Sequence, residues 1–117
     1  MVPGILAEMT APLIANLEKL LGTPRDGALL RYSLGSEYLK AGSIERGIEH
    51  LREALRRDPQ YSAAWKALGR ALADAGRPDE AREVYARGIE AAHAKGDRQA
   101  EKEMTVFARR LERDRSG

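Results

Sequence analysis

The residues whose side chains could do chemistry are few and stand apart from one another. The two histidines, His50 and His93, have no further histidine at helical spacing, and the chain contains no cysteine. A metal site or a cysteine nucleophile would need such groups in clusters. None of the serines that could act as nucleophiles has a histidine placed to serve as its base; they are Ser33, Ser36, Ser43 and Ser62. We therefore expect no catalytic residue and no bound metal.

One acidic pair, Asp79-Glu80, could suggest acid–base catalysis, but its surroundings indicate another role. It lies in the stretch ADAGRPDEARE, where Gly76 suits the end of one helix and Pro78 the first turn of the next. Carboxylates in a first helical turn stabilise the positive end of the helix dipole. The glycines do not have the spacing of a phosphate-binding loop, so we also expect no cofactor.

The composition indicates a globular chain, with 43% hydrophobic and 32% charged residues. The 20 basic and 18 acidic residues give a net charge of +2, which is too balanced to indicate nucleic-acid binding, although the pI is near 9.1. No apolar run is long enough to span a bilayer, and the first residues lack the pattern of a signal peptide. We expect no membrane segment and a cytoplasmic location.

Helical periodicity covers most of the chain and predicts an all-α fold of about six helices. The expected helices cover residues 9–22, 27–40, 43–57, 62–74, 78–94 and 97–114. Residues 1–8 and 115–117 are expected to be loose tails. In the first helix Thr10 is expected as the N-cap and Pro12 in the first turn, and Ser43 is expected to cap the third. Because the corners between helices are short, neighbouring helices should form antiparallel hairpins.

A repeat appears when the chain is shifted along itself by 34 residues. Identical residues then coincide, namely Leu34-Gly35 with Leu68-Gly69, Ala41-Gly42 with Ala75-Gly76, and Glu49 with Glu83. The unit Ala28–Tyr61 carries a characteristic set of residue types, which are Leu34, Gly35, Tyr38, Gly47, Leu51, Ala54 and Pro59. The unit Ser62–Lys95 carries its own version of the set, which is Trp65, Leu68, Gly69, Leu72, Ala81, Tyr85 and Gly88.

On these residues the sequence resembles the tetratricopeptide repeat (TPR) family. The first unit departs from the pattern at Arg31, where the family has an aromatic residue, and the second at His93, where it has proline. The resemblance implies a TPR-like right-handed α-solenoid of antiparallel helix hairpins. It also implies that the first helix of each repeat lines a groove that binds peptides.

Four glycines inside predicted helices point to close helix contacts. Each costs roughly 1 kcal/mol relative to alanine, so a compensating packing role is expected. We expect Gly35 to face Gly47 and Ala54, and Gly69 to face Ala81 and Gly88; these pairs would bring together the two helices of each repeat.

The repeat register divides the chain, which we expect to form a single domain over residues 1–117. Residues 9–22 form an N-terminal helix that resembles the second half of an incomplete repeat. Residues 26–61 form the first repeat and residues 62–95 the second. Residues 97–114 form a capping helix whose Met104-x2-Phe107-Ala108-x2-Leu111 is similar to the start of a repeat.

The resemblance implies a partner-binding site when the groove positions of the family are carried over to this chain. They fall on Tyr32, Ser36, Lys40, Lys66, Arg70, Asp74, Lys102 and Arg109. Lys66 and Arg70 share a helix face on which only Asp74 opposes them, and this favours a peptide or helix of acidic character in a partner protein. Chaperone-binding members hold a C-terminal carboxylate with a Lys/Asn/Arg set, and only Lys102 agrees with that set. Recognition of chaperone tails is therefore disfavoured.

Two alternatives stay open beside this non-catalytic interaction module. The first is a homo-oligomerising scaffold, because the stripe Leu13, Leu17, Leu20 and Leu21 of the first helix is broad enough to form a dimer contact. The second is a basic helical protein associated with nucleic acid, on account of the run Arg109 to Arg115. Carboxylates interrupt that run and no aromatic residues interleave with it, which disfavours the nucleic-acid alternative.

Overall fold

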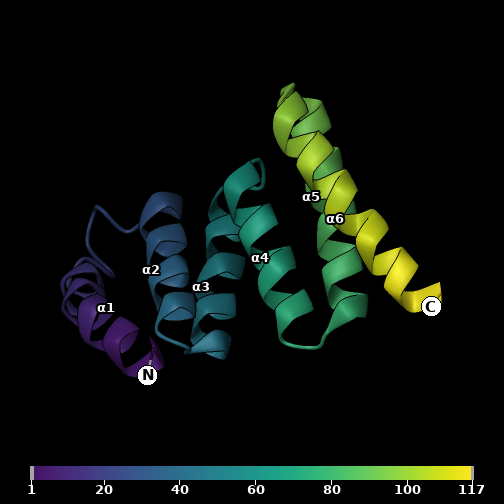
Figure 1. Cartoon of the computed structure of the whole chain (residues 1–117). Coiled ribbons are helices and arrows are strands. Elements are labelled where there is room, and N and C mark those ends of the chain that lie inside the picture. Colours follow the sequence, from purple (N-terminus) through teal and green to yellow (C-terminus); the bar gives the residue numbers. More distant parts are fainter. Residues whose placement is uncertain (1, 117) are drawn as a thin grey trace. The chain divides into compact units, whose positions relative to one another are not determined.

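The computed structural model describes the backbone of residues 2–116 and the side chains of residues 10–115. The described residues form six helices and no strand, as predicted (Figure 1). They are α1 (Val2–Glu18), α2 (Ala28–Lys40), α3 (Ile44–Arg57), α4 (Ser62–Asp74), α5 (Pro78–Lys95) and α6 (Arg98–Ser116). The chain divides into two compact units, residues 1–58 and residues 59–117, and each is considered by itself. The organisation of the whole chain as one domain stays a prediction.

The first unit contains α1, α2 and α3. Helices α2 and α3 form an antiparallel hairpin, and α1 packs on α2 (Figure 1). The core between α1 and α2 holds Ile14, Leu30, Leu34 and Tyr38. Leu51 of α3 is also fully buried. Burying an aliphatic side chain of this size contributes about 1.5–3 kcal/mol, so this apolar layer is what fixes the three helices together.

Two glycines allow α2 and α3 to approach closely, as the sequence predicted. A Cβ atom added to Gly35 would lie 2.8 Å from Cγ of Leu51 and 3.0 Å from the carbonyl oxygen of Gly47. A Cβ atom added to Gly47 would lie 2.7 Å from Cγ of Leu39 and 3.1 Å from the carbonyl oxygen of Gly35. Both helices therefore present bare backbone to each other at this contact.

Asp26 connects the segment before α2 to both neighbouring helices. Its carboxylate accepts hydrogen bonds from Arg31 at 2.9 and 3.0 Å and from the backbone amide of Gly22 at 3.0 Å. Arg57 of α3 lies 3.6 Å from the same carboxylate and donates to the carbonyl oxygen of Asp26 at 2.6 Å. The hydrogen bonds from Arg31 and Gly22 hold the pKa of Asp26 far below its usual range.

The prediction for the first helix is wrong at both ends. Helix α1 begins at Val2 rather than at residue 9, and it ends at Glu18 rather than at residue 22. Pro12 lies inside the helix, and Thr10 is buried within it instead of capping it. A proline normally marks a first turn, which explains the error. After Glu18 the chain enters consecutive turns that lead to Gly22, whose φ of +77° ends the helical direction.

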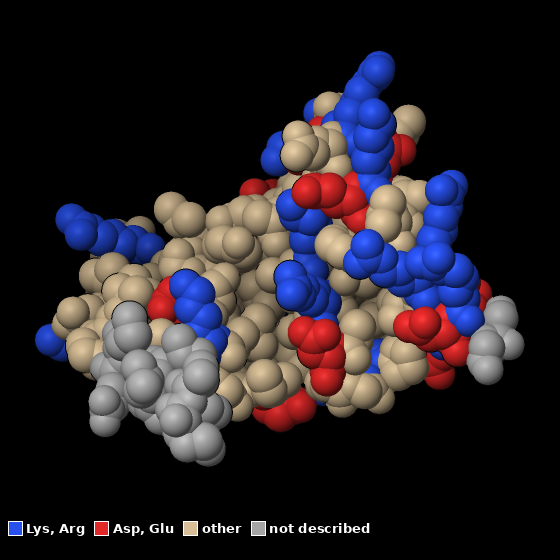
Figure 2. Space-filling view, in the orientation of Figure 1, with Lys and Arg blue, Asp and Glu red and all other residues tan. Residues whose placement is uncertain are grey.

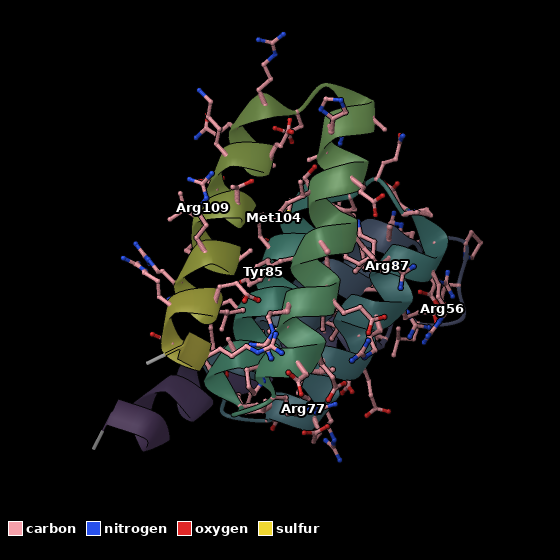
Figure 3. The ribbon with its side chains drawn as sticks, turned by 90° about the vertical axis from the view of Figure 1, so that its right-hand side faces the viewer. Arg56, Arg77, Tyr85, Arg87, Met104 and Arg109 are labelled. Carbon is pink, nitrogen blue, oxygen red and sulfur yellow. The ribbon has the colours of Figure 1, made fainter. Side chains whose placement is uncertain are left out.

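The second unit contains α4, α5 and α6. Helices α4 and α5 form an antiparallel hairpin, and α6 packs on α5 and also contacts α4. Figure 3 shows Met104 of α6 and Tyr85 of α5 pointing into the space between these helices. The core holds Trp65, Leu68, Leu72, Tyr85 and Met104, all of them buried. Trp65 also donates its indole N–H to the carbonyl oxygen of Pro59 at 2.7 Å.

The glycines of this unit face larger neighbours than predicted. The nearest atoms to a Cβ added at Gly69 all belong to the ring of Tyr85, with Cζ at 2.6 Å, rather than to Ala81 or Gly88. A Cβ added at Gly88 would lie 2.6 Å from Sδ of Met104 and 2.7 Å from Cβ of Trp65. Each glycine therefore receives a large side chain against its backbone, which the one-dimensional pattern of small residues could not reveal.

Helix ends in both units follow the predicted turn chemistry in part. Gly42, Gly76 and Gly96 have φ values of +85°, +76° and +82°, the left-handed conformation that favours glycine after a helix. Asp97 accepts a hydrogen bond from the amide of Ala100 at 3.1 Å, and this bond lowers the pKa of Asp97. Ser43 holds the N-cap position of α3, but its side chain makes no capping hydrogen bond, so that detail of the prediction is wrong.

Replacing Gly69 by alanine tests the contact with Tyr85. We expect Gly69→Ala to lower the free energy of unfolding by about 1–3 kcal/mol, because overpacking outweighs the helix preference of alanine. In a Tyr85→Val background, which lacks the crowding ring atoms, the same change should stabilise by about 1 kcal/mol. Urea unfolding followed by circular dichroism measures both. An equal effect of Gly69→Ala in the two backgrounds would contradict the contact.

Replacing Asp26 by asparagine tests the connection between α2 and α3. A carboxyl whose pKa is lowered by folding stabilises the protein above its unfolded pKa and loses that effect as the pH falls. We therefore expect Asp26→Asn to melt at a lower temperature at pH 7, and the difference from the original protein to shrink below about pH 4. Glu90→Gln, at an exposed position within α5, is the control and should show a much smaller difference. A pH-independent gap for Asp26→Asn would contradict the ionic connection.

Candidate functional site

The α2 part of the predicted site lies on one face of that helix. Tyr32, Ser36 and Lys40 follow one another at intervals of four residues, which places them on successive turns. Tyr32 and Ser36 are half-buried, whereas Lys40 is exposed and pairs with Glu37 at 3.1 Å. Leu29, near the start of the same helix, is 69% exposed. The α2 face thus combines an exposed leucine with a tyrosine and a paired lysine.

The α4 part of the predicted site repeats this spacing in the second unit. Lys66, Arg70 and Asp74 lie on successive turns of α4, away from the buried side that packs against α5. Lys66 donates to Oε1 of Glu103 on α6 at 2.7 Å, and Arg70 lies 3.9 Å from Asp74. The expectation that only Asp74 opposes the two cations is therefore wrong. Glu103 neutralises Lys66 across the α4–α6 contact.

The α6 part of the predicted site lines a hollow of about 700 Å³. Its lining comes from the end of α5, the following corner and one face of α6, and consists of His93, Gly96, Arg98, Glu101, Lys102, Thr105, Val106 and Arg109. Lys102 and Arg109 are the two predicted residues in it. In Figure 3, Arg109 extends from α6 on the side away from Met104 and Tyr85. The hollow is therefore on the outside of the α5–α6 packing.

Sequence reasoning missed Arg98, which joins Lys102 and Arg109 in this hollow. At about 100° per helical residue the three cations lie within roughly 40° of one another around α6. We call Arg98, Lys102 and Arg109 the α6 basic column. The spacing of four and seven residues could have revealed Arg98. The repeat register, however, places Arg98 before the groove positions of a repeat, so the resemblance gave it no role.

Other polar groups at the hollow are engaged with one another. Nδ1 of His93 lies 3.2 Å from Oε2 of Glu101, and the hydroxyl of Thr105 donates to the backbone carbonyl of Glu101 at 2.7 Å. Val106, in contrast, is 45% exposed beside the column. On the face drawn in Figure 2, Lys and Arg atoms lie interspersed with Asp and Glu atoms. This mixture does not resemble the continuous basic surface that nucleic acids require.

The two histidines have different surroundings, and neither belongs to a ligand cluster. His50 of α3 stacks on Tyr38, with ring centroids 5.5 Å apart, and burial lowers its pKa. His93 is exposed and pairs with Glu101. Among the described residues, no group of three or more His, Cys, Asp or Glu side chains could hold a metal ion. The search of those residues also finds no helix that is both long and apolar enough to cross a membrane.

Comparison with known protein families confirms the family that the 34-residue repeat suggested. A tetratricopeptide repeat model matches residues 32–96, which contain most of α2 and all of α3, α4 and α5. The match thus covers both hairpins on which the glycine contacts lie.

Several known proteins are similar to this chain in sequence or structure. A TPR repeat-containing protein of Pseudomonas aeruginosa is 50% identical over 104 residues, which cover 89% of this chain and 99% of that protein. The solution structure of a protein from Bordetella parapertussis is 42% identical, with a TM-score of 0.75, covering 86% of this chain and 88% of that one. A tetratricopeptide repeat domain protein of Salinibacter ruber is 29% identical, with a TM-score of 0.71, over 74% of this chain and 88% of that one.

Proposed function

This chain belongs to the tetratricopeptide repeat family, and from that premise we propose that it is a non-catalytic module that binds a peptide or helix of a partner protein. The fold supports a protein–protein interaction module in general, and members of the family are typically non-catalytic. The finer part of the proposal concerns the binding face. Each unit contributes a face of its own, namely the exposed face of α2 in the first unit and the exposed faces of α4 and α6 in the second.

The face of α4 carries the proposal. Its opposite side is anchored by Trp65, Leu68 and Leu72, which are buried against the rest of the unit. Lys66, Arg70 and Asp74 are thereby presented outward from a rigid helix at regular spacing. A site on a well-packed helix is more precisely positioned than one on a loop, and little ordering of the protein is needed when a partner binds. Tyr32 on α2 adds an amphipathic side chain of the kind common at binding hot spots.

Reversing the charges on α4 tests the proposed face. We expect Lys66→Glu combined with Arg70→Glu to lose the partners that the original protein captures from its native source, because an acidic segment would then meet like charges. Affinity capture with quantitative mass spectrometry measures the loss. An unchanged set of partners would remove α4 from the site.

Two controls accompany the charge reversal. Arg25→Glu combined with Arg56→Glu makes the same change in net charge at exposed residues outside α2, α4 and α6, and should keep the partners. Because Lys66 pairs with Glu103, the reversal also breaks an ion pair between α4 and α6. Adding Glu103→Lys restores an opposite-charge pair without restoring the basic face. If this addition recovered binding, the effect of the reversal would come from α4–α6 packing and not from partner contact.

Self-association is the second candidate function, and two exposed leucines favour it. Leu29 is 69% and Leu13 44% exposed, and exposed aliphatic side chains of this size are suited to a contact between copies. Most of the predicted leucine stripe, however, is covered within the unit. Ile14 is buried, and Leu17, Leu20 and Leu21 pack against the α1–α2 core. The face available to a second copy is therefore narrower than the sequence suggested.

Sedimentation equilibrium separates the two candidates. A module that acts as a monomer should sediment at the mass of the chain, 12.9 kDa, at all micromolar concentrations. A scaffold that associates through the exposed leucines should show a mass that rises with concentration. In that case Leu13→Asp with Leu29→Asp should return it to 12.9 kDa, whereas the α4 charge reversal should leave the mass unchanged.

A further inference from the structure

We propose that the α6 basic column is a subsite for an extended acidic segment of a partner protein, with carboxylates on Arg98, Lys102 and Arg109 and an apolar side chain on Val106. The inference rests on the proposed function, because it assumes that the module binds a partner segment. The sequence predicted that Lys66 and Arg70 of α4 bind the acidic segment, whereas this proposal places that segment in the hollow on α6.

The cations of α4 and those of α6 differ in whether they pair with carboxylates of the protein. Lys66 is held by Glu103 at 2.7 Å, and Arg70 shares its helix face with Asp74. Arg98, Lys102 and Arg109, in contrast, pair with no carboxylate among the described residues. An incoming carboxylate would have to displace Glu103 from Lys66, whereas the α6 basic column accepts it without breaking an existing pair.

The α6 basic column lies in a concave surface that also has an apolar component. The hollow has a volume of about 700 Å³, and Val106, which is 45% exposed, is one of the residues that line it. Cations on a convex helix surface with no apolar neighbour would simply be solvated by water. A hollow that combines unpaired cations with an exposed valine offers both an electrostatic and a hydrophobic contact, as peptide-binding sites do.

Arg98 lies in the first turn of α6. The N-terminal end of a helix is electrically positive, so a cation there is repelled by the helix dipole. Arg98 therefore adds to an unfavourable field that a bound anion would offset. Asp97, the residue before it, is already engaged by the amide of Ala100 and does not face Arg98 as an ion-pair partner in the structure.

The spacing of the column indicates the form of the ligand. With a rise of 1.5 Å per helical residue, Arg98 and Lys102 stand about 6 Å apart along the axis, and Lys102 and Arg109 about 10 Å apart. An extended peptide advances about 3.3 Å per residue. Its acidic residues should therefore be spaced by about two and then about three positions, with an apolar residue in the longer interval, opposite Val106.

The local charge pattern favours a peptide over a nucleic acid. Glu101 lines the same hollow and Glu103 lies on the adjoining face of α6. A polynucleotide carries a charge at every phosphate and would meet these carboxylates, whereas a peptide presents a few carboxylates that the three cations can match individually. The apolar contact on Val106 also suits a peptide side chain.

Fluorescence anisotropy with a defined peptide tests the subsite. The probe is a short fluorescein-labelled peptide with Glu, Glu and Asp at the derived spacing and Leu in the longer interval. A neutral probe has Gln, Gln and Asn instead, and single-stranded oligothymidylate is the third. We expect the acidic probe to bind, and Arg98→Gln/Lys102→Gln/Arg109→Gln to weaken its binding by roughly tenfold to a hundredfold, since each exposed charge contact contributes a factor of roughly two to five. The neutral probe should bind no better to the original protein than the acidic probe binds to this variant.

A matched variant controls for net charge and folding. Arg56→Gln/Arg110→Gln/Arg115→Gln removes as many cations outside the column, two of them from other faces of α6, and should bind the acidic probe as the original protein does. Because Arg98 opposes the helix dipole, the column variant should melt at the same or a higher temperature than the original protein. Equal loss of binding in the two variants would overturn the proposal, as would tighter binding of oligothymidylate than of the acidic peptide.

Partner capture distinguishes failure of this subsite from failure of the proposed function. If the column variant retains the captured partners while the α4 charge reversal loses them, the module binds a segment and the α6 subsite is wrong. If neither variant loses any of the partners that the original protein captures, the proposed function is itself wrong. If the column variant loses both the captured partners and the acidic probe, the subsite is supported.

Discussion

The close approach of helix backbones at the glycines is the constraint on which the rest of the structure depends. At Gly35 and Gly47 the backbones of α2 and α3 lie so near each other that an added Cβ would meet backbone oxygen at 3.0 and 3.1 Å. Each helical glycine costs about 1 kcal/mol in helix preference. That cost is offset because the approach lets Leu34 and Leu51 become fully buried. In the second unit the glycines instead leave room for side chains, because Gly69 receives the ring of Tyr85 and Gly88 receives Met104 and Trp65.

Much of the fold could be predicted because these constraints repeat within 34 residues. The bounds of α4 agree with the prediction at both ends, and Gly42, Gly76 and Gly96 adopt the left-handed conformation expected after a helix. The largest error in helix bounds fell where no repeat supported the pattern. Pro12 looked like a helix start, although α1 continues through it from Val2. The partners of Gly69 were also missed, because the choice between Ala81 and the ring of Tyr85 depends on how α5 is rotated about its axis.

The candidate site could be predicted only as a set of helix faces. Positions on one helix follow from local spacing, so the alignment of Lys66, Arg70 and Asp74 was accessible from the sequence. The pairing of Lys66 with Glu103 was not, because it depends on how α6 crosses α4. The same holds for the hollow beside Lys102 and Arg109, which requires the end of α5 to lie next to α6. Contacts between residues far apart in the sequence thus decided which cations are neutralised.

The packed interior around the glycines and the charged surface contribute to the structure in different ways. Apart from the carboxylate of Asp26, which is largely buried, the ion pairs of this chain are mostly exposed, and each is worth about 0–1 kcal/mol. Pairs this weak constrain the fold little, so the surface charges can vary while the helices keep their packing. Breaking an exposed pair such as Lys66–Glu103 therefore costs little free energy. The pair nevertheless attracts an acidic ligand only weakly, because its two charges cancel. The α6 basic column has no carboxylate partner among the described residues, so its full positive charge would attract an acidic ligand more strongly than the paired cations of α4.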